Sequence, residues 1–112
     1  MLTIATIVRN EANRFLPSAL AAWSSFADRI VVLDDGSHDG TPELCEEAGC
    51  EVHRRDARMF GVEWQARREL WHLACPGADW VVWLDADQVP SCDPRPHLKA
   101  PVSLFPRLDA KA

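Results

Sequence analysis

The residues best suited to chemistry are two aspartates, Asp85 and Asp87, which directly follow a short apolar run. The run, residues 80–84, reads Trp-Val-Val-Trp-Leu and lacks polar alternation, which predicts a strand buried on both faces. Two carboxylates held close together repel each other, and a hard divalent cation with oxygen ligands relieves that repulsion. An isolated Asp-x-Asp is more often a polar turn that ends a strand, so the pair alone does not define a metal site.

The elements that would position this pair alternate between strand and helix. Apolar runs predict further strands at residues 2–8 and 30–33, and a weaker pattern predicts one at residues 50–53; a helix is expected after each of these strands. The links between strands are too long for hairpins, so we expect parallel strands joined by right-handed crossovers. The pattern predicts a three-layer α/β fold in which helices flank a mostly parallel sheet.

Residues that favour helix ends set the expected boundaries. We expect Asn13 to be the N-cap of the first helix, which places Pro17 in the first turn, where its missing N–H breaks no hydrogen bond. Thr41 is the expected N-cap of the second helix and Gly49 its C-cap. The third helix should cover about residues 61–74.

Polar clusters follow three of the four predicted strands, at residues 9–11 (Arg-Asn-Glu), 34–35 (Asp-Asp) and 85–87 (Asp-Ala-Asp). Ligands of such sheets bind beyond the carboxyl ends of the strands, near the point where the strand order reverses. If the order is 3-2-1-4, all three clusters converge on one cleft. The sequence therefore predicts a metal-assisted nucleotide or phosphate pocket at this edge.

Arg67 is the notable residue of the third helix. At a helical period it falls within an apolar arc, where a guanidinium is costly unless it reaches an anion or extends to solvent. Pairing with a cleft aspartate or a bound diphosphate would satisfy it. A structural ion pair, or a side-chain stem that covers a tryptophan, accounts for it equally well.

Composition excludes several classes of protein. The chain has 112 residues, enough for one domain, and its net charge of -5 with a pI near 5.2 argues against nucleic-acid binding. No apolar run approaches the roughly 20 residues of a membrane span, and the first residues do not form a signal peptide, so we expect a cytoplasmic protein. The four cysteines lack zinc-site spacing, which predicts reduced, structural thiols.

At four places in order, the chain resembles family 2 glycosyltransferases with the Rossmann-like GT-A fold. Four motifs at suitable spacing are far more specific than any one of them. They are Asn10-Glu11, Asp34-Asp35-Gly36-Ser37-His38-Asp39-Gly40-Thr41, Ala66-Arg67-Arg68 and Leu84-Asp85-Ala86-Asp87. Asn10-Glu11 and Glu63-Trp64 are similar to the branch that contains bacterial lipopolysaccharide-core sugar transferases.

The resemblance implies a site for a nucleoside-diphosphate sugar, with UDP favoured. Asp35, together with Asp34, would contact the base or ribose, and Arg67 would face the diphosphate. Asp85 would lie near the ribose, and Asp87 would bind Mn²⁺ or Mg²⁺ with Asp85 beside it. The metal would neutralise charge on the leaving diphosphate while an acceptor oxygen attacks with inversion.

The resemblance covers roughly residues 2–90 and implies a truncated GT-A domain. We expect residues 1–90 to be the nucleotide-sugar-binding half and the Pro-rich residues 91–112 to begin a missing acceptor half. Family members are longer and carry the general base beyond the Asp-x-Asp segment, so we expect no catalytic base in this chain. The alternative is a non-catalytic module that binds nucleotide and metal without transferring sugar.

The partners that follow are a nucleoside-diphosphate sugar and a glycan or lipid-linked acceptor of unknown structure. Peripheral association with the inner face of a membrane is compatible with such an acceptor. An uncovered edge at the fourth strand would favour a homodimer. A receiver-like signalling domain is disfavoured because the first strand ends in Arg-Asn rather than in an acid pair, and a nucleotidyltransferase because no Gly-rich loop follows that strand.

Overall fold

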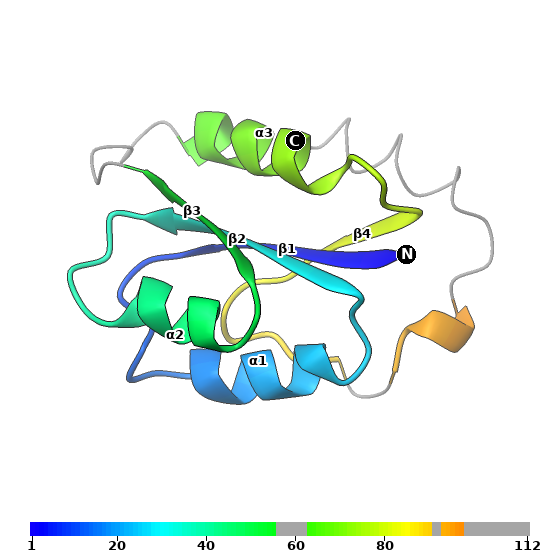
Figure 1. The fold of residues 1–112 in the computed structure, drawn as a ribbon, viewed down its shortest axis with the longest axis horizontal. Coiled ribbons are helices and arrows are strands. Elements are labelled where there is room, and N and C mark those ends of the chain that lie inside the picture. The colour runs from blue at the N-terminus through cyan, green and yellow to red at the C-terminus, as the bar shows by residue number, and fades with distance from the viewer. Residues whose placement is uncertain (56–62, 91–92, 98–112) are drawn as a thin grey trace.

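The computed structural model describes residues 1–55, 63–90 and 93–97, which form a parallel sheet with helices on both faces (Figure 1). The sheet has four strands in the order β3-β2-β1-β4, as the sequence predicts. The strands are β1 (Leu2–Val8), β2 (Arg29–Asp35), β3 (Glu51–Arg55) and β4 (Trp80–Trp83). The helices are α1 (Leu16–Ser24), α2 (Thr41–Glu47), α3 (Glu63–Ala74) and the short 3₁₀ helix η1 (Arg95–His97).

Each face of the sheet carries its own apolar core, with α1 and α2 on one side and α3 on the other (Figure 1). Successive residues of β1 point to opposite faces, so Ile4 packs in the core of α1 and Ala5 in the core of α3. This two-sided burial explains why the central strands β1 and β2 contain long apolar runs, whereas the edge strand β3 is polar and largely unburied. The strands β3 and β4 form the two edges of the described sheet, and pairing of two chains through β4 stays a prediction.

The first helix begins later than the sequence suggests. Its N-cap is Phe15 rather than Asn13, and no side chain caps it. The cause is a turn before the helix, in which the Arg14 N–H donates to the Glu11 carbonyl at 3.1 Å. Pro17 does lie in the first turn, as expected.

The second helix also begins one residue away from the predicted position. Gly40 is its N-cap and Thr41 its first residue, because the Thr41 hydroxyl bonds the loop after β1 instead of capping its own helix. The helix ends at Ala48 as C-cap rather than at Gly49. Gly49 follows with a φ of +87°, the left-handed conformation that glycine adopts without steric cost.

Arg29 joins the first residue of β2 to the end of α3. Its guanidinium donates to the carbonyls of Leu73 at 3.1 Å and of Ala74 at 3.3 Å, and it forms a 2.6 Å ion pair with Glu51 of β3. The last carbonyls of a helix lack partners within the helix. A cation near them donates hydrogen bonds and also interacts favourably with the negative end of the helix dipole. Arg29 therefore fixes the end of α3 to the first residues of β2 and β3, at the end of the sheet opposite the polar clusters.

Within the described residues, no helix is both long enough and apolar enough to cross a bilayer. The expected start of the third helix, at residues 61–62, lies outside the described part of the chain, as does most of the Pro-rich segment. The proposed division at residue 90 stays a prediction.

Candidate functional site

The loops that follow β1 and β2 are hydrogen-bonded to each other. The Asn10 N–H donates to Ser37 Oγ at 2.9 Å, and the His38 N–H donates to Asn10 Oδ1 at 2.8 Å. Asn10 has a φ of 52°, a left-handed conformation that asparagine tolerates better than most residues. These bonds fix two of the three predicted polar clusters against each other.

Thr41 makes a second connection between the same loops. Its Oγ1 accepts the N–H groups of Glu11 at 2.9 Å and Ala12 at 3.0 Å, and its hydroxyl donates to Asp39. The Thr41 hydroxyl lowers the pKa of Asp39 by stabilising the carboxylate, which more than offsets the effect of burial. The first turn of α2 is therefore part of the site's frame.

The adjacent carboxylates at the end of β2 have different surroundings. Asp34 is buried at 2% exposure, and its oxygens accept the Ser37 N–H at 3.1 Å and the Ser37 hydroxyl at 2.5 Å. Asp35 is half-buried, and its buried Oδ1 has no hydrogen-bond partner among the described residues. Because an unpaired buried oxygen is costly, Asp35 is the carboxylate whose geometry favours an external donor.

The loop after β4 presents Asp85 and Asp87 on one side of the chain, since Ala86 between them is buried in the core. Gln88 shapes this turn. Its side-chain Oε1 accepts the Asp85 N–H at 2.8 Å, and its own N–H donates to the Asp85 carbonyl at 2.9 Å. The buried Trp23 indole of α1 donates to the Gln88 carbonyl at 2.9 Å, which anchors the turn.

A cavity of about 240 Å³ lies between the loops that follow β1 and β4. Neither Asp85 nor Asp87 makes a side-chain hydrogen bond or ion pair to the described residues, and both are exposed to this cavity. Phe15, which is 61% exposed, forms part of its wall. The cavity is lined by Ile7, Glu11, Arg14, Phe15, Asp85, Ala86 and Asp87.

The three polar clusters lie at the carboxyl ends of β1, β2 and β4, as the strand order predicts. The predicted single cleft is only partly formed, because Asp34 and Asp35 are not among the described residues that line the cavity. The clusters after β1 and β2 share hydrogen bonds, and those after β1 and β4 share the cavity. Residues 3–95 match the sequence profile described as glycosyl transferase family 2. The chain belongs to this family.

Solved structures of glucosyl-3-phosphoglycerate synthase from Mycobacterium tuberculosis share the GT-A fold. Its complex with UDP is 20% identical with a TM-score of 0.56, over 80% of this chain and 34% of that one. Its complex with Mn²⁺, UDP and glucosyl-3-phosphoglycerate is also 20% identical, with a TM-score of 0.56. That match covers 80% of the present chain and 36% of the synthase chain. A TPR repeat-containing protein of Synechococcus elongatus is 37% identical over 87 residues, or 78% of this chain and 20% of that protein. This chain spans about a third of the solved synthase chain and a fifth of the TPR repeat-containing protein.

Arg67 belongs to the apolar arc of α3 by helical period, as the sequence predicts, but its side chain extends out of that arc and contacts a tryptophan. The buried side of the helix consists of Ala66, Leu70, Trp71 and Ala74, whereas Arg67 is exposed. Its guanidinium carbon lies 5.6 Å from the centre of the ring of Trp83, which is the last residue of β4. Since Trp83 precedes Asp85 by two residues, this cation–π contact brings the guanidinium to the end of the strand that carries the aspartates.

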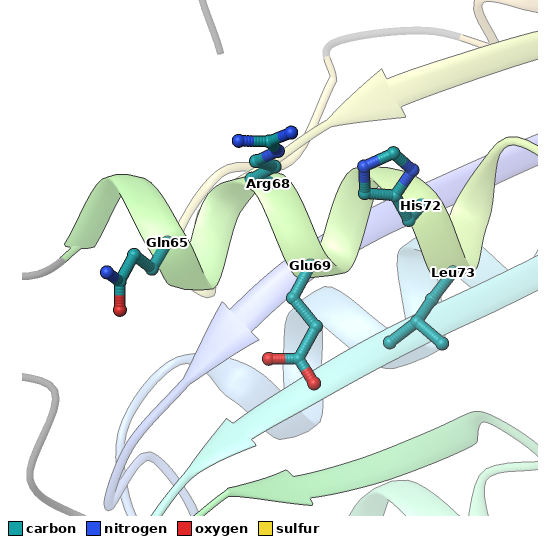
Figure 2. Close-up of a pocket in the computed structure, with 5 residues that line it drawn as sticks. All are labelled: Gln65, Arg68, Glu69, His72 and Leu73. Carbon is teal, nitrogen blue, oxygen red and sulfur yellow. The ribbon is translucent and has the colours of Figure 1, made fainter.

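A larger hollow of about 470 Å³ runs along α3 (Figure 2). Its described lining residues all belong to this helix, and Glu69 among them forms a 2.9 Å ion pair with Arg55. Ligand sites usually combine a few polar groups that converge on one point; the smaller cavity draws such groups from several elements, whereas the described lining of this hollow comes from α3 alone. The lining residues are Gln65, Arg68, Glu69, His72 and Leu73.

The carboxylates Asp85 and Asp87 at the smaller cavity fit a metal site that is completed by water and substrate oxygens. The described residues contain no group of three or more His, Cys, Asp or Glu side chains arranged to hold a metal ion. Mg²⁺ commonly binds through one or two carboxylates, with waters and substrate phosphates as its other ligands. Asp85 and Asp87 match that pattern and do not match an all-protein cage.

Proposed function

We propose that this chain is the donor-binding part of a glycosyltransferase that uses a nucleoside-diphosphate sugar, with UDP favoured. The observation that carries the proposal is the cavity at the carboxyl edge of the sheet, where the exposed carboxylates of Asp85 and Asp87 face the loop after β1. The Mn²⁺ and UDP in the solved relative support this choice of ligands. The sugar would pass with inversion to a glycan or lipid-linked acceptor.

We assign Asp35 to the base or ribose of the donor, because its buried Oδ1 is unpaired among the described residues and a ligand N–H or O–H would satisfy it. Asp34 would support that contact by fixing the loop through Ser37. Asp85 would lie near the ribose. Arg67 would leave or extend its contact with Trp83 to meet the diphosphate, since a guanidinium gains more from a phosphate than from an aromatic ring.

Asp87 and Asp85 would hold Mn²⁺ or Mg²⁺ together with the diphosphate oxygens. The bound cation supplies charge neutralisation for the departing nucleotide. The chain's own contribution is to keep the two carboxylates on one side of the turn, through Ala86 in the core and Gln88 across the turn.

The acceptor site and the general base would lie in a part of the enzyme that this chain does not contain, since it spans about a third of the solved relatives. Within the family, we propose the branch of lipopolysaccharide-core sugar transferases on the strength of Asn10-Glu11 and Glu63-Trp64.

The first test is calorimetric titration of the 112-residue chain with UDP and then GDP, in Mn²⁺ and again in EDTA. We expect UDP to bind in Mn²⁺ and to lose at least about tenfold in affinity in EDTA or in Asp87→Asn, because the cation bridges carboxylate and diphosphate. Glu47→Gln removes the same charge from an exposed position of α2 and should bind normally. A folded chain that binds neither nucleotide would contradict the proposal.

A further inference from the structure

Two cysteines, Cys45 and Cys50, are brought together by the turn that ends α2. The Gly49 N–H donates to the Glu46 carbonyl at 3.0 Å, and the Cys50 N–H donates to the Cys45 carbonyl, also at 3.0 Å. This pair of bonds, with Gly49 at positive φ, is the Schellman motif. In that motif the residue after the glycine packs its side chain against the residue five positions earlier, and here both are cysteines.

The two thiols have unequal surroundings. Cys45 is fully buried and Cys50 is half-buried, at the start of the link to β3. A hydrogen bond from the Cys45 thiol to the Cys50 sulfur lowers the pKa of Cys50 and, together with burial, raises the pKa of Cys45. A thiol with a lowered pKa and partial access is the nucleophile in cysteine oxidation, and a neighbouring thiol is what resolves it.

We propose that Cys45 and Cys50 form a dithiol site that hydrogen peroxide oxidises to an intramolecular disulfide. The Cys50 thiolate attacks one peroxide oxygen, the O–O bond breaks, and the departing hydroxide takes up a proton, which leaves Cys50 as a sulfenic acid. The Cys45 sulfur then attacks the Cys50 sulfur, the S–O bond breaks, and the hydroxyl leaves with the Cys45 proton as a second water. Two thiols lose two electrons in total, and the peroxide becomes two waters.

The competing account is that both residues serve only as small apolar side chains in the contact that Schellman motifs usually contain. That account predicts no preference for a bond between them. It also leaves Cys50 to oxidise no differently from Cys75, which is half-buried as well.

The test treats the reduced 112-residue chain with hydrogen peroxide under native conditions and blocks the remaining thiols with a maleimide. A glutamyl endopeptidase then cleaves after Glu46 and Glu47, between the two cysteines. We expect the two resulting fragments to stay joined until a reductant is added, with a joined mass ~2 Da below their sum. Recovery of Cys45 as its maleimide adduct with Cys50 as adduct, sulfinic or sulfonic acid would overturn the proposal.

Three variants complete the experiment. Cys75→Ser combined with Cys92→Ser leaves only the pair and should keep the yield of the joined fragments unchanged. Cys45→Ala removes the resolving thiol, so Cys50 should progress to the sulfinic acid, about 32 Da heavier. Cys50→Ser, at the more accessible position, should leave Cys45 free to react with maleimide only after unfolding. If the joined fragments persist in either single variant of the pair, the bond involves another cysteine and the proposal is wrong.

Discussion

The Thr41 hydroxyl oxygen lies 2.9 Å from the backbone nitrogen of Glu11 and so joins the first turn of α2 to the loop after β1. The same oxygen accepts the Ala12 N–H, and the side chain is fully buried. One hydroxyl thus holds the loop that lines the cavity against the start of α2, the helix that follows β2 and its last residue, Asp35.

Thr41→Val tests this connection, because it keeps the shape of the side chain and removes the acceptor. Two backbone N–H groups lose their partner, so we expect a loss of about 1–3 kcal/mol in the free energy of unfolding, measured by urea denaturation. Thr41→Ser retains the hydroxyl and should lose only the ~1 kcal/mol that deletion of one buried methyl group costs. Equal stability of the valine variant and the parent would show that the hydroxyl is not needed.

Arg29→Met removes the cation that binds the last carbonyls of α3 and Glu51 of β3. We expect the free energy of unfolding to fall by ~1–2 kcal/mol, because carbonyls at the end of the helix lose a charged donor. Arg54→Met is the matched control, since Arg54 pairs only with Glu43 and Glu46 at the surface in the described structure. Urea unfolding of both variants measures the difference, and equal losses would contradict a specific role for Arg29.

Glu51 gives the fold a dependence on pH. Burial acts to raise the pKa of Glu51, but hydrogen bonds from Arg29 and His53 outweigh it and leave the pKa lowered. A carboxyl group with a lower pKa in the native state stabilises the fold fully above its unfolded pKa of about 4.3 and loses that contribution as pH falls through the native value. We therefore expect stability to decline on acidification below about pH 4.3, and the decline to be shallower in Glu51→Gln. A parallel decline in both proteins would exclude Glu51 as a source.

Much of the fold follows from the sequence because the relevant signals are local. Residues 80–84 predict a strand, and β4 (Trp80–Trp83) lies there, although only Val81 of it is buried because β4 is an edge strand of the described sheet. The alternation of strand and helix allows few topologies. The strand order then places the clusters after β1, β2 and β4 at one edge. Gly49 marks the end of α2 because its backbone conformation is one that glycine tolerates best.

The remaining features depend on contacts between distant residues, which no local pattern encodes. Threonine is a residue type that favours the N-cap position, yet the Thr41 hydroxyl accepts a hydrogen bond from a loop about 30 residues earlier in the chain. Arg67 falls in an apolar arc by periodicity, but its length lets the guanidinium leave the stripe and reach Trp83. The contacts of Arg29 with the end of α3 and of the Gln88 carbonyl with Trp23 were not predicted, because these partners lie far away in the sequence.

Phe15 offers a test of the cavity as the donor site. The ring is 61% exposed and lines the cavity with Asp85 and Asp87, so it can pack against a ring of the bound ligand. We expect Phe15→Ala to weaken UDP-sugar binding about three- to tenfold, with little change in urea unfolding because the side chain is exposed. Phe15→Tyr preserves the aromatic face and should bind like the parent. Unchanged affinity of the alanine variant would place the ligand elsewhere.

Of the three carboxylates that line the cavity, Glu11 pairs with Arg14, which leaves Asp85 and Asp87 to bind a cation. We therefore predict that the metal and the nucleotide each bind more tightly to the protein when the other is already bound. With only Asp85 and Asp87 as protein ligands, water would fill most coordination positions of the cation, so Mn²⁺ alone should bind weakly. Diphosphate oxygens should replace some of those waters. Linkage then requires that UDP tighten Mn²⁺ by the same factor as Mn²⁺ tightens UDP, on the order of 5- to 150-fold for typical coupling. Titration of Mn²⁺ with and without UDP measures that factor, and Asp85→Asn and Asp87→Asn should each reduce it. If Mn²⁺ affinity does not depend on UDP, the cation binds away from the nucleotide and the two aspartates have another role.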